Sequence, residues 1–304
     1  MRTVTFRQLF IRLFKDSFQE FTKNDPLRQA GATAFFTTFA LPAILIIIIQ
    51  LLGLIVDPKQ LSIQLFHNIS GIIGKETTVQ LVETLRALRK VSQNWAITIG
   101  GFVFLLFVAT TLFRVIKSSL NQIWKVRVVK KQRFAAIARS RFKAVMIIFS
   151  AGVLFIIGIL AEGAQAFLGN YIRNVLPFLA VYFNTSLNYL ISVITVTAWF
   201  ALVFRFLPDG RPTWKIGITG AFVTSILFNI GKFILGWLLT YSNINTIYGA
   251  SASTVLLLLF VFYTSMIFYF GAAFTKVWAI YKQEPIKPLP HAIHYQIMEV
   301  DHES

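Results

Sequence analysis

The chain has 304 residues, of which 56% are hydrophobic and only 13% are charged. A soluble domain of this size carries about 25% charged residues, and the charges here are absent from long blocks, so the composition excludes an ordinary soluble protein and indicates a membrane protein. The net charge is +17, cysteine is absent and Phe accounts for 31 residues. A disulfide scaffold, thiol catalysis and a disordered or fibrous chain are therefore excluded as well.

The first 25 residues predict an amphipathic helix. Phenylalanine and leucine recur there at helical spacing, basic side chains lie between them, and Asp25 and Pro26 mark the end of the helix. A helix of this kind lies on the inner membrane surface with its apolar stripe in the lipid. The same stripe is also compatible with packing against other helices of the protein, so the sequence leaves both placements open.

Six transmembrane helices are predicted next, because an α-helix needs about 20 apolar residues to cross a bilayer core of about 30 Å. Five runs with at most one charged residue reach about this length, namely 29–56, 91–113, 144–161, 174–204 and 216–275. The last run is too long for one helix, and turn-forming polar residues in 241–249 divide it. The sequence therefore predicts an all-α, polytopic membrane domain over residues 26–280.

The distribution of Lys and Arg orients these helices, because basic residues are retained on the cytoplasmic side. Six lie in 1–28, ten in 114–143, three in 205–215 and three from 276 onward, whereas the alternate segments 57–95 and 162–173 hold five and one. Both termini are therefore expected in the cytoplasm. The positive net charge follows from this bias together with attraction to anionic lipid, so nucleic acid is not an expected partner.

Three segments lie outside the predicted spans. Residues 57–94 predict a short extracytoplasmic insertion of two helices separated by glycines, which caps the bundle or rims a cavity. Residues 114–143 form a basic cytoplasmic connection without an acidic residue; it is either only the topology signal or also a surface for lipid headgroups. Residues 281–304 contain three prolines and scattered polar residues, which predicts a flexible cytoplasmic tail.

Two ionisable side chains fall inside the predicted spans, where each is costly unless it is paired or hydrated. Glu162 and Lys232 lie at a similar depth toward the outer side, so an ion pair between the third and fifth helices is one interpretation. The other is that Lys232 extends to the outer headgroups and that Glu162 ends its helix.

A stripe of polar and small residues surrounds Lys232 on the fifth predicted helix. Ser225, Asn229 and Gly236 share its side of the helix, and with Gln165 they predict a polar cleft that serves as a substrate pathway. Close helix packing explains the same stripe without any pathway. Packing roles are also expected for Gly249 and Ser253 in the sixth helix, while Pro42 should kink the first.

Residues for catalysis are scarce. His67 is isolated, and His291, His294 and His302 lie in the tail, where no rigid surroundings are expected to hold a metal. No phosphate-binding glycine motif follows a strand. The sequence therefore predicts neither an enzyme nor a metal or cofactor site.

Several short stretches resemble the YihY/BrkB family of bacterial inner-membrane proteins, a group once labelled ribonuclease BN. They are NDPLRQAGATAFFTTFALP at 24–42, LNQIW at 120–124, LPDGRPTW at 207–214, GA at 220–221, GK at 231–232, YGA at 248–250 and GAAFT at 271–275. The resemblance implies six spans in the inner (plasma) membrane with both termini in the cytoplasm. Family members often carry Glu where this chain has Ala273, so no role of that acid is transferred.

These observations lead to the hypothesis of a protein that transports or translocates a lipid or another amphiphilic envelope component. Lys232 and the basic inner surface would attract anionic headgroups. The alternative is a non-transporting scaffold for envelope proteins, and a ribonuclease comes third because clustered metal ligands are absent. The expected partners are membrane lipids, above all anionic ones, and unknown envelope proteins, and a homo-oligomer remains open.

Overall fold

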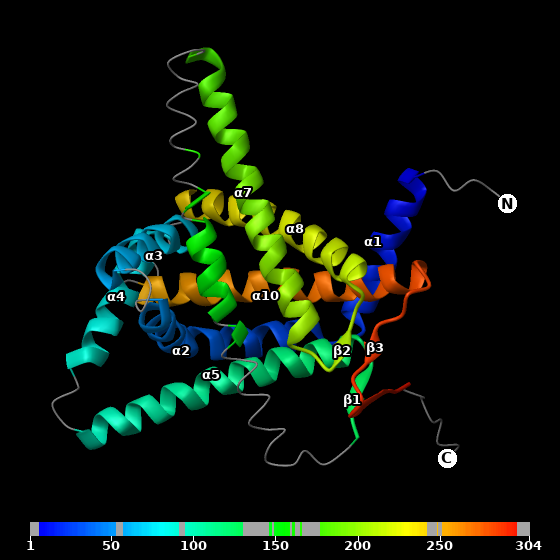
Figure 1. Ribbon diagram of the computed structural model, residues 1–304, viewed down its shortest axis with the longest axis horizontal. Coiled ribbons are helices and arrows are strands. Elements are labelled where there is room, and N and C mark those ends of the chain that lie inside the picture. Colours follow the sequence, from blue (N-terminus) through cyan, green and yellow to red (C-terminus); the bar gives the residue numbers. More distant parts are fainter. Residues whose placement is uncertain are drawn as a thin grey trace.

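The computed structural model describes residues 6–52, 57–90, 95–129, 146–147, 149–158, 160–161, 165, 177–241, 248 and 251–296. Within these ranges the protein is mostly helical, as the sequence predicts, and it also contains two short two-stranded sheets (Figure 1). The helices are α1 (Phe6–Thr22), α2 (Pro26–Leu52), α3 (Pro58–Ile73), α4 (Lys75–Lys90), α5 (Trp95–Ile123), α7 (Pro177–Phe206), α8 (Trp214–Tyr241) and α10 (Ala252–Tyr281). The strands are β1 (Val126–Val128), β2 (Gly210–Arg211), β3 (Lys287–Pro288) and β4 (Ala292–His294).

Three of the described helices contain segments that are long and apolar enough to cross a membrane. These segments are Ser186–Phe206, Trp214–Trp237 and Thr254–Tyr281. The first two predicted runs fall on α2 and α5, and the third contains a shorter apolar helix, Phe149–Gly158. The structure thus supports a helical membrane protein, whereas the number of six spans stays a prediction.

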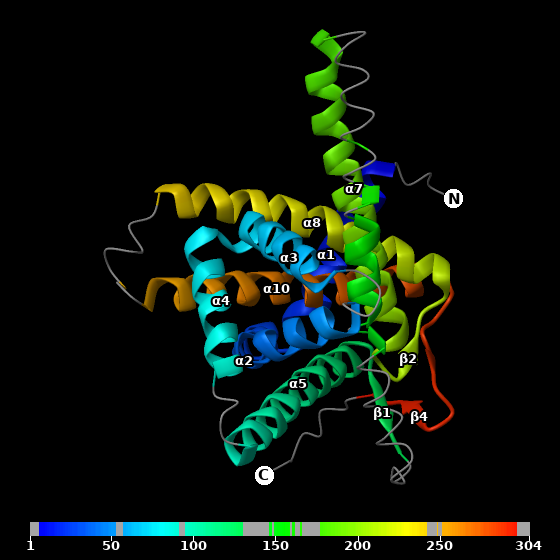
Figure 2. The same ribbon diagram turned by 60° about the vertical axis from the view of Figure 1, so that its left-hand side comes forward.

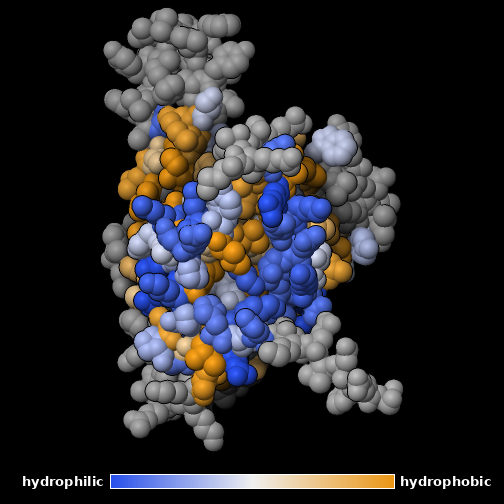
Figure 3. All heavy atoms as spheres, turned by 90° about the vertical axis from the view of Figure 1, so that its right-hand side faces the viewer, coloured by the Kyte–Doolittle hydropathy of each residue, from blue (hydrophilic) through white to orange (hydrophobic). Residues whose placement is uncertain are grey.

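Helix α10 occupies the middle of the molecule and contacts α1, α2, α5 and α8. In both ribbon views α8, α10 and α2 run beside one another, while α7 crosses α8 and projects beyond it (Figures 1 and 2). The first residues of α2 and α8 and the last residues of α5, α7 and α10 meet at one end, which we call the polar end (Figure 1). Figure 3 looks onto this end and shows hydrophilic side chains gathered across it, with hydrophobic ones beside and between them.

Small residues allow α8 and α10 to approach closely. A Cβ atom at Gly220 would overlap the Thr275 side chain, and one at Gly271 would overlap Thr224. Each threonine also donates its hydroxyl to the carbonyl oxygen of the glycine four residues earlier in its own helix, at 2.7 Å. The two helices therefore present the same Gly-x-x-x-Thr pattern to each other, and the threonine hydroxyls remain hydrogen-bonded in an apolar contact.

Aromatic side chains fill the space between α5, α7 and α10 near the polar end. Phe204 stacks on Phe268 with ring centroids 5.3 Å apart, and Trp124 lies 6.2 Å from Phe204. Trp124 also donates its indole N–H to the carbonyl oxygen of Ala272 at 3.0 Å. A buried indole needs such an acceptor, and Ala272 leaves its carbonyl within reach because its own side chain is small.

The N-terminal helix α1 packs on one side and is exposed on the other. Leu13, Ser17 and Phe21 are buried, and the ring of Phe14 lies 5.8 and 5.7 Å from two phenylalanines of α10. Other apolar side chains of α1, among them Phe18, remain exposed. Packing against another helix, one of the two placements that the sequence left open, thus accounts for part of the apolar stripe.

Residues 57–94, where the sequence predicts two short helices, contain α3 and α4. The two helices meet at Gly74, whose φ of 88° favours glycine. Asp57 precedes α3 and accepts a hydrogen bond from the backbone N–H of Lys59 at 2.8 Å. Pro42 lies inside α2, which continues past it from Pro26 to Leu52.

The tail expected to be flexible is folded over its described part, which is a correction to the sequence prediction for 281–304. Strand β3 pairs with β2 and strand β4 pairs with β1, both antiparallel. Ile286 is buried and packs so close to Gly210 that a Cβ there would lie 3.0 Å from its Cγ2 atom. The prolines suggested a loose end, but a few apolar residues and backbone hydrogen bonds to distant strands hold the segment in place.

The α8–α10 contact predicts that Gly271→Ala destabilises the protein by about 1–3 kcal/mol, the usual cost of overpacking. Gly236→Ala on α8 is the matched control, because a Cβ there meets nothing within 4 Å. Thermal unfolding of both variants in detergent measures the difference. Equal unfolding midpoints for the two variants would contradict the close approach.

Candidate functional site

A buried carboxylate, Asp209, organises the loop between α7 and α8 at the polar end. Its Oδ1 atom lies 2.8 Å from Lys117 Nζ and 3.0 Å from His291 Nε2. Its Oδ2 atom accepts a hydrogen bond from Asn121 Nδ2 at 2.8 Å, and its backbone N–H donates to Asn121 Oδ1 at 2.8 Å. The backbone carbonyl accepts from Leu289 N, so one residue joins α5, this loop and the tail.

Two opposing effects act on the acidity of Asp209. Burial alone raises its pKa, but hydrogen bonds from Lys117, His291 and Asn121, together with the charge of Lys117, outweigh burial and hold the pKa below its ordinary value. Asp209 is thus a charged, fully coordinated group whose role is to hold three parts of the chain together.

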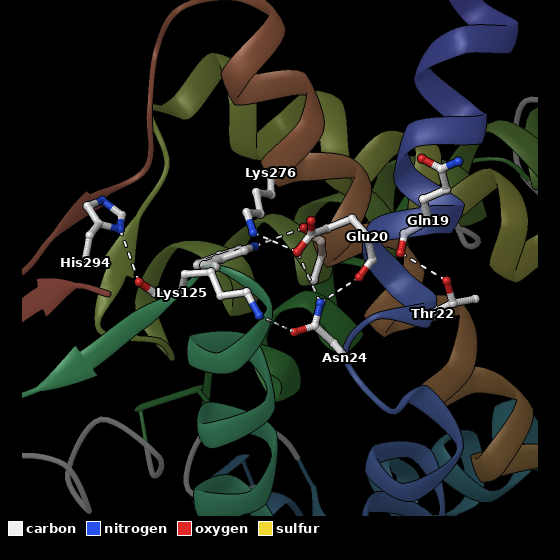
Figure 4. Close-up of polar contacts among 9 residues, drawn as sticks. Gln19, Glu20, Thr22, Asn24, Lys125, Lys276 and His294 are labelled. Carbon is white, nitrogen blue, oxygen red and sulfur yellow. Dashed lines mark hydrogen bonds and ion pairs between the residues drawn. The ribbon is translucent and has the colours of Figure 1, made fainter. Parts of the chain in front are cut away.

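A second polar cluster, around Asn24, lies where α1, α5 and α10 meet (Figure 4). The Asn24 side chain is 1% exposed. Its amide nitrogen donates to the Glu20 carboxylate at 3.2 Å, and its amide oxygen accepts from Lys125 Nζ at 3.1 Å. Glu20 also pairs with Lys276 Nζ at 2.7 Å. The Asn24 amide therefore lies between one ion pair and a second lysine.

Lys125 is the unbalanced charge of this cluster. Burial and the nearby Lys276 lower its pKa, and this effect outweighs the charge of Glu20, which raises the pKa. No carboxylate forms an ion pair with Lys125 in the part of the chain that the structure describes. The side chain is half-buried and its φ is 53°, an uncommon value for a residue other than glycine. A nearby anion would favour the charged form of this lysine.

A line of buried polar side chains leads from the Asn24 cluster into the apolar bundle. Gln29 Nε2 donates to the Asn24 carbonyl at 2.7 Å, while Gln29 Oε1 has no partner among the described residues. Thr33 lies one turn further along α2 and forms a 2.6 Å hydrogen bond with Tyr269 of α10. Tyr269 also bonds to Ser119 of α5. Buried polar groups of three helices thus form one continuous set.

The stripe predicted as a pathway on α8 lies against α7. Ser225 and Asn229 are buried. Ser225 Oγ donates to the Val193 carbonyl at 3.0 Å, and Asn229 Oδ1 accepts from Ser192 Oγ at 3.0 Å. Asn229 Nδ2 donates to the Ser225 carbonyl at 2.9 Å. In this structure the two residues thus bond across the contact between α7 and α8, as the packing interpretation expects.

The other predicted site residues are not brought together by the described chain. Lys232 is half-buried on α8, without an ion pair among the described residues, and Gly236 is exposed one turn beyond it. Gln165 is buried. Glu162 and Gly249 lie outside the described residues, so the pairing of Glu162 with Lys232 is not addressed, and Ser253 lies in α10.

Sequence reasoning did not identify Asp209, Asn24 or Lys125 as site residues. Asp209 lies between Pro208 and Gly210, and Asn24 lies two residues before Pro26, both in short loops. This is the usual pattern of an exposed turn. Two of the family motifs could have pointed to this site. The motif LNQIW contains Asn121 and the motif LPDGRPTW contains Asp209, and these two residues form the hydrogen bonds described above.

A family model described as virulence factor BrkB matches residues 17–294 of this chain. The chain belongs to this family. The result confirms the resemblance read from the short motifs. No solved structure matches the chain.

Bacterial relatives of this BrkB-family chain are named UPF0761 membrane proteins. One from Teredinibacter turnerae is 26% identical, with 91% of this chain and 63% of the relative aligned. One from Mannheimia succiniciproducens is 24% identical, over 91% of this chain and 92% of the relative. A third, from Saccharophagus degradans, is 24% identical over 88% of this chain and 60% of the relative. The chain spans about three fifths of the first and third relatives, and the names fit a bacterial membrane location.

The coordination of Asp209 predicts that Asp209→Asn destabilises the protein by about 2 kcal/mol, because hydrogen bonds to a charged group are weakened. A carboxylate with a lowered folded-state pKa stabilises the protein above its unfolded pKa of about 3.9, and this stability is lost as the pH falls through the lower folded value. Thermal unfolding between about pH 7 and 3 should therefore show a steeper acid loss in the wild type than in Asp209→Asn.

The matched control is Asp25→Asn, since Asp25 is exposed and forms a surface pair with Arg28. Such pairs contribute about 0–1 kcal/mol. The account of Asp209 fails if the two variants have the same stability at neutral pH.

Proposed function

We propose that this protein translocates an anionic lipid or a similar amphiphile across the bacterial inner membrane, with its polar end in the cytoplasm. One observation carries the proposal: the polar side chains of Gln29, Thr33, Tyr269 and Ser119 lie between apolar helices and lead inward from the polar end. Buried polar groups are costly in a membrane and often mark a substrate path.

The distribution of charge agrees with an anionic substrate. The polar end carries Lys125 without a carboxylate partner among the described residues, and Lys232 lies half-buried within an apolar span. A headgroup could be attracted at the first position and met by the second on the other side of the membrane. In this proposal the protein is not an enzyme, and lipids are its main partners.

A scaffold for envelope proteins is the second candidate. It is favoured by the α8 stripe, since Ser225 and Asn229 are buried and hydrogen-bonded across the contact with α7 rather than open to water. A scaffold requires a stable bundle and an exposed surface but no hydrated path.

Translocation of a fluorescent anionic phospholipid into the inner leaflet of proteoliposomes tests the proposal directly. The wild type is expected to move the lipid faster than empty vesicles do, and Lys232→Ala is expected to slow it. Lys215→Ala, an exposed lysine in the first turn of α8, serves as the control. Folded protein without translocation of anionic lipid would refute the proposal.

Cysteine accessibility separates a path from a packed bundle, and the absence of native cysteine makes the experiment clean. Thr33→Cys on the α2 side of the polar line should react with a water-soluble thiol reagent. Thr224→Cys should be protected, although both threonines are buried, because Thr224 packs against Gly271. Equal protection of the two cysteines would favour the scaffold.

A further inference from the structure

We propose that Lys125, with Lys276 beside it, forms a binding site for a phosphate group at the polar end. The inference deepens the proposed function and rests on it only in naming a phospholipid headgroup as the source of that phosphate. A free phosphate has the same chemistry, and the experiment below distinguishes the two.

The first argument is the charge balance of the Asn24 cluster. Lys276 Nζ is paired with Glu20 Oε1 at 2.7 Å, and this carboxylate also accepts from Asn24 Nδ2. Lys125 Nζ is left with the neutral Asn24 amide oxygen at 3.1 Å. Lys23 adds positive charge near Lys125. One carboxylate thus faces several ammonium groups, and an anion would complete the balance.

The second argument is that Lys125 is held in position by its backbone. Its N–H donates to the Gln122 carbonyl at 3.1 Å, and its own carbonyl accepts from Tyr295 N at 3.0 Å. The ring nitrogen Nδ1 of His294 lies 3.3 Å from that carbonyl. The docked tail therefore fixes the left-handed backbone of Lys125, and the hydrogen bond to Asn24 Oδ1 orients its Nζ atom. A donor held in this way loses less entropy when it binds a ligand.

The third argument concerns access and the type of ligand. Lys125 is half-buried and remains partly open to solvent, whereas the Asp209 side chain is 2% exposed and is enclosed by its own partners. Lysine binds phosphate as a point charge.

The test uses the full-length protein in nanodiscs of phosphatidylcholine, with phosphatidylglycerol added in one arm and inorganic phosphate in the buffer in another. Lipid retention by native mass spectrometry and the thermal unfolding midpoint report binding. Lys125→Gln should raise the half-saturating amount of ligand about tenfold, the effect of losing one charged hydrogen bond. Lys125→Arg should largely restore it, and the exposed control Lys215→Gln should leave it unchanged.

The variant Glu20→Gln distinguishes a binding site from a purely structural cluster, because the two predict opposite changes in affinity. It removes the competing carboxylate while keeping an amide that can still bond to Asn24, so it should bind the probe more tightly than the wild type does. A purely structural cluster would instead be weakened by Glu20→Gln and Lys125→Gln alike, and that result overturns the proposal. If Lys125→Gln does not fold, Glu20→Gln alone still tests the site.

The two arms identify the source of the phosphate. A response to phosphatidylglycerol only assigns a lipid headgroup, and a response to inorganic phosphate as well assigns a general phosphate site. If binding follows the charge pattern but proteoliposomes move no lipid, the site stands and the transport proposal fails. If lipid moves and Lys125→Gln binds like the wild type, the site fails and transport stands.

Discussion

The close approach of α8 and α10 is the constraint on which the arrangement of the described helices depends. Gly220 faces Thr275 and Gly271 faces Thr224, so the two backbones come nearer than larger side chains would allow. In a membrane, apolar side chains gain little by leaving lipid, and close packing with hydrogen-bonded small residues becomes the main attraction between helices. Because α10 also contacts α1, α2 and α5, its position against α8 determines where the rest of the bundle can lie.

At the polar end, hydrogen bonds and ion pairs rather than close helix packing hold the segments together. Asp209 connects α5 with the loop before α8 and with the tail, and Asn24 connects α1 with the residues after α5. Both side chains are almost fully buried. The two clusters differ in charge, since Asp209 is paired with Lys117, whereas Lys125 in the second cluster lacks a carboxylate partner among the described residues. The same end of the protein thus contains one closed structural site and one site suited to a ligand.

The sequence predicted the membrane class, the family and the positions of the long helices, because these follow from hydrophobic length and from local motifs. It also predicted that Ser225 and Asn229 share a helix face. It could not say whether that face meets water or protein, since the answer depends on where α7 crosses α8. The docked tail was missed for a similar reason. Val126 pairs with His294, and no local pattern specifies a partner so distant along the chain.

The pairing of β4 with β1 has a consequence for the order of biosynthesis. Residue 291 is translated after all the long helices that the structure describes, so at first Asp209 has Lys117 and Asn121 as partners but lacks His291. The backbone of Lys125 likewise receives its bond from Tyr295 only after that residue has been synthesised. A chain that stops at residue 281 would therefore contain the described helices but would lack the hydrogen bonds that the tail forms at the polar end. The last fifteen or so described residues therefore complete the hydrogen bonds of the polar end after the described helices have been synthesised.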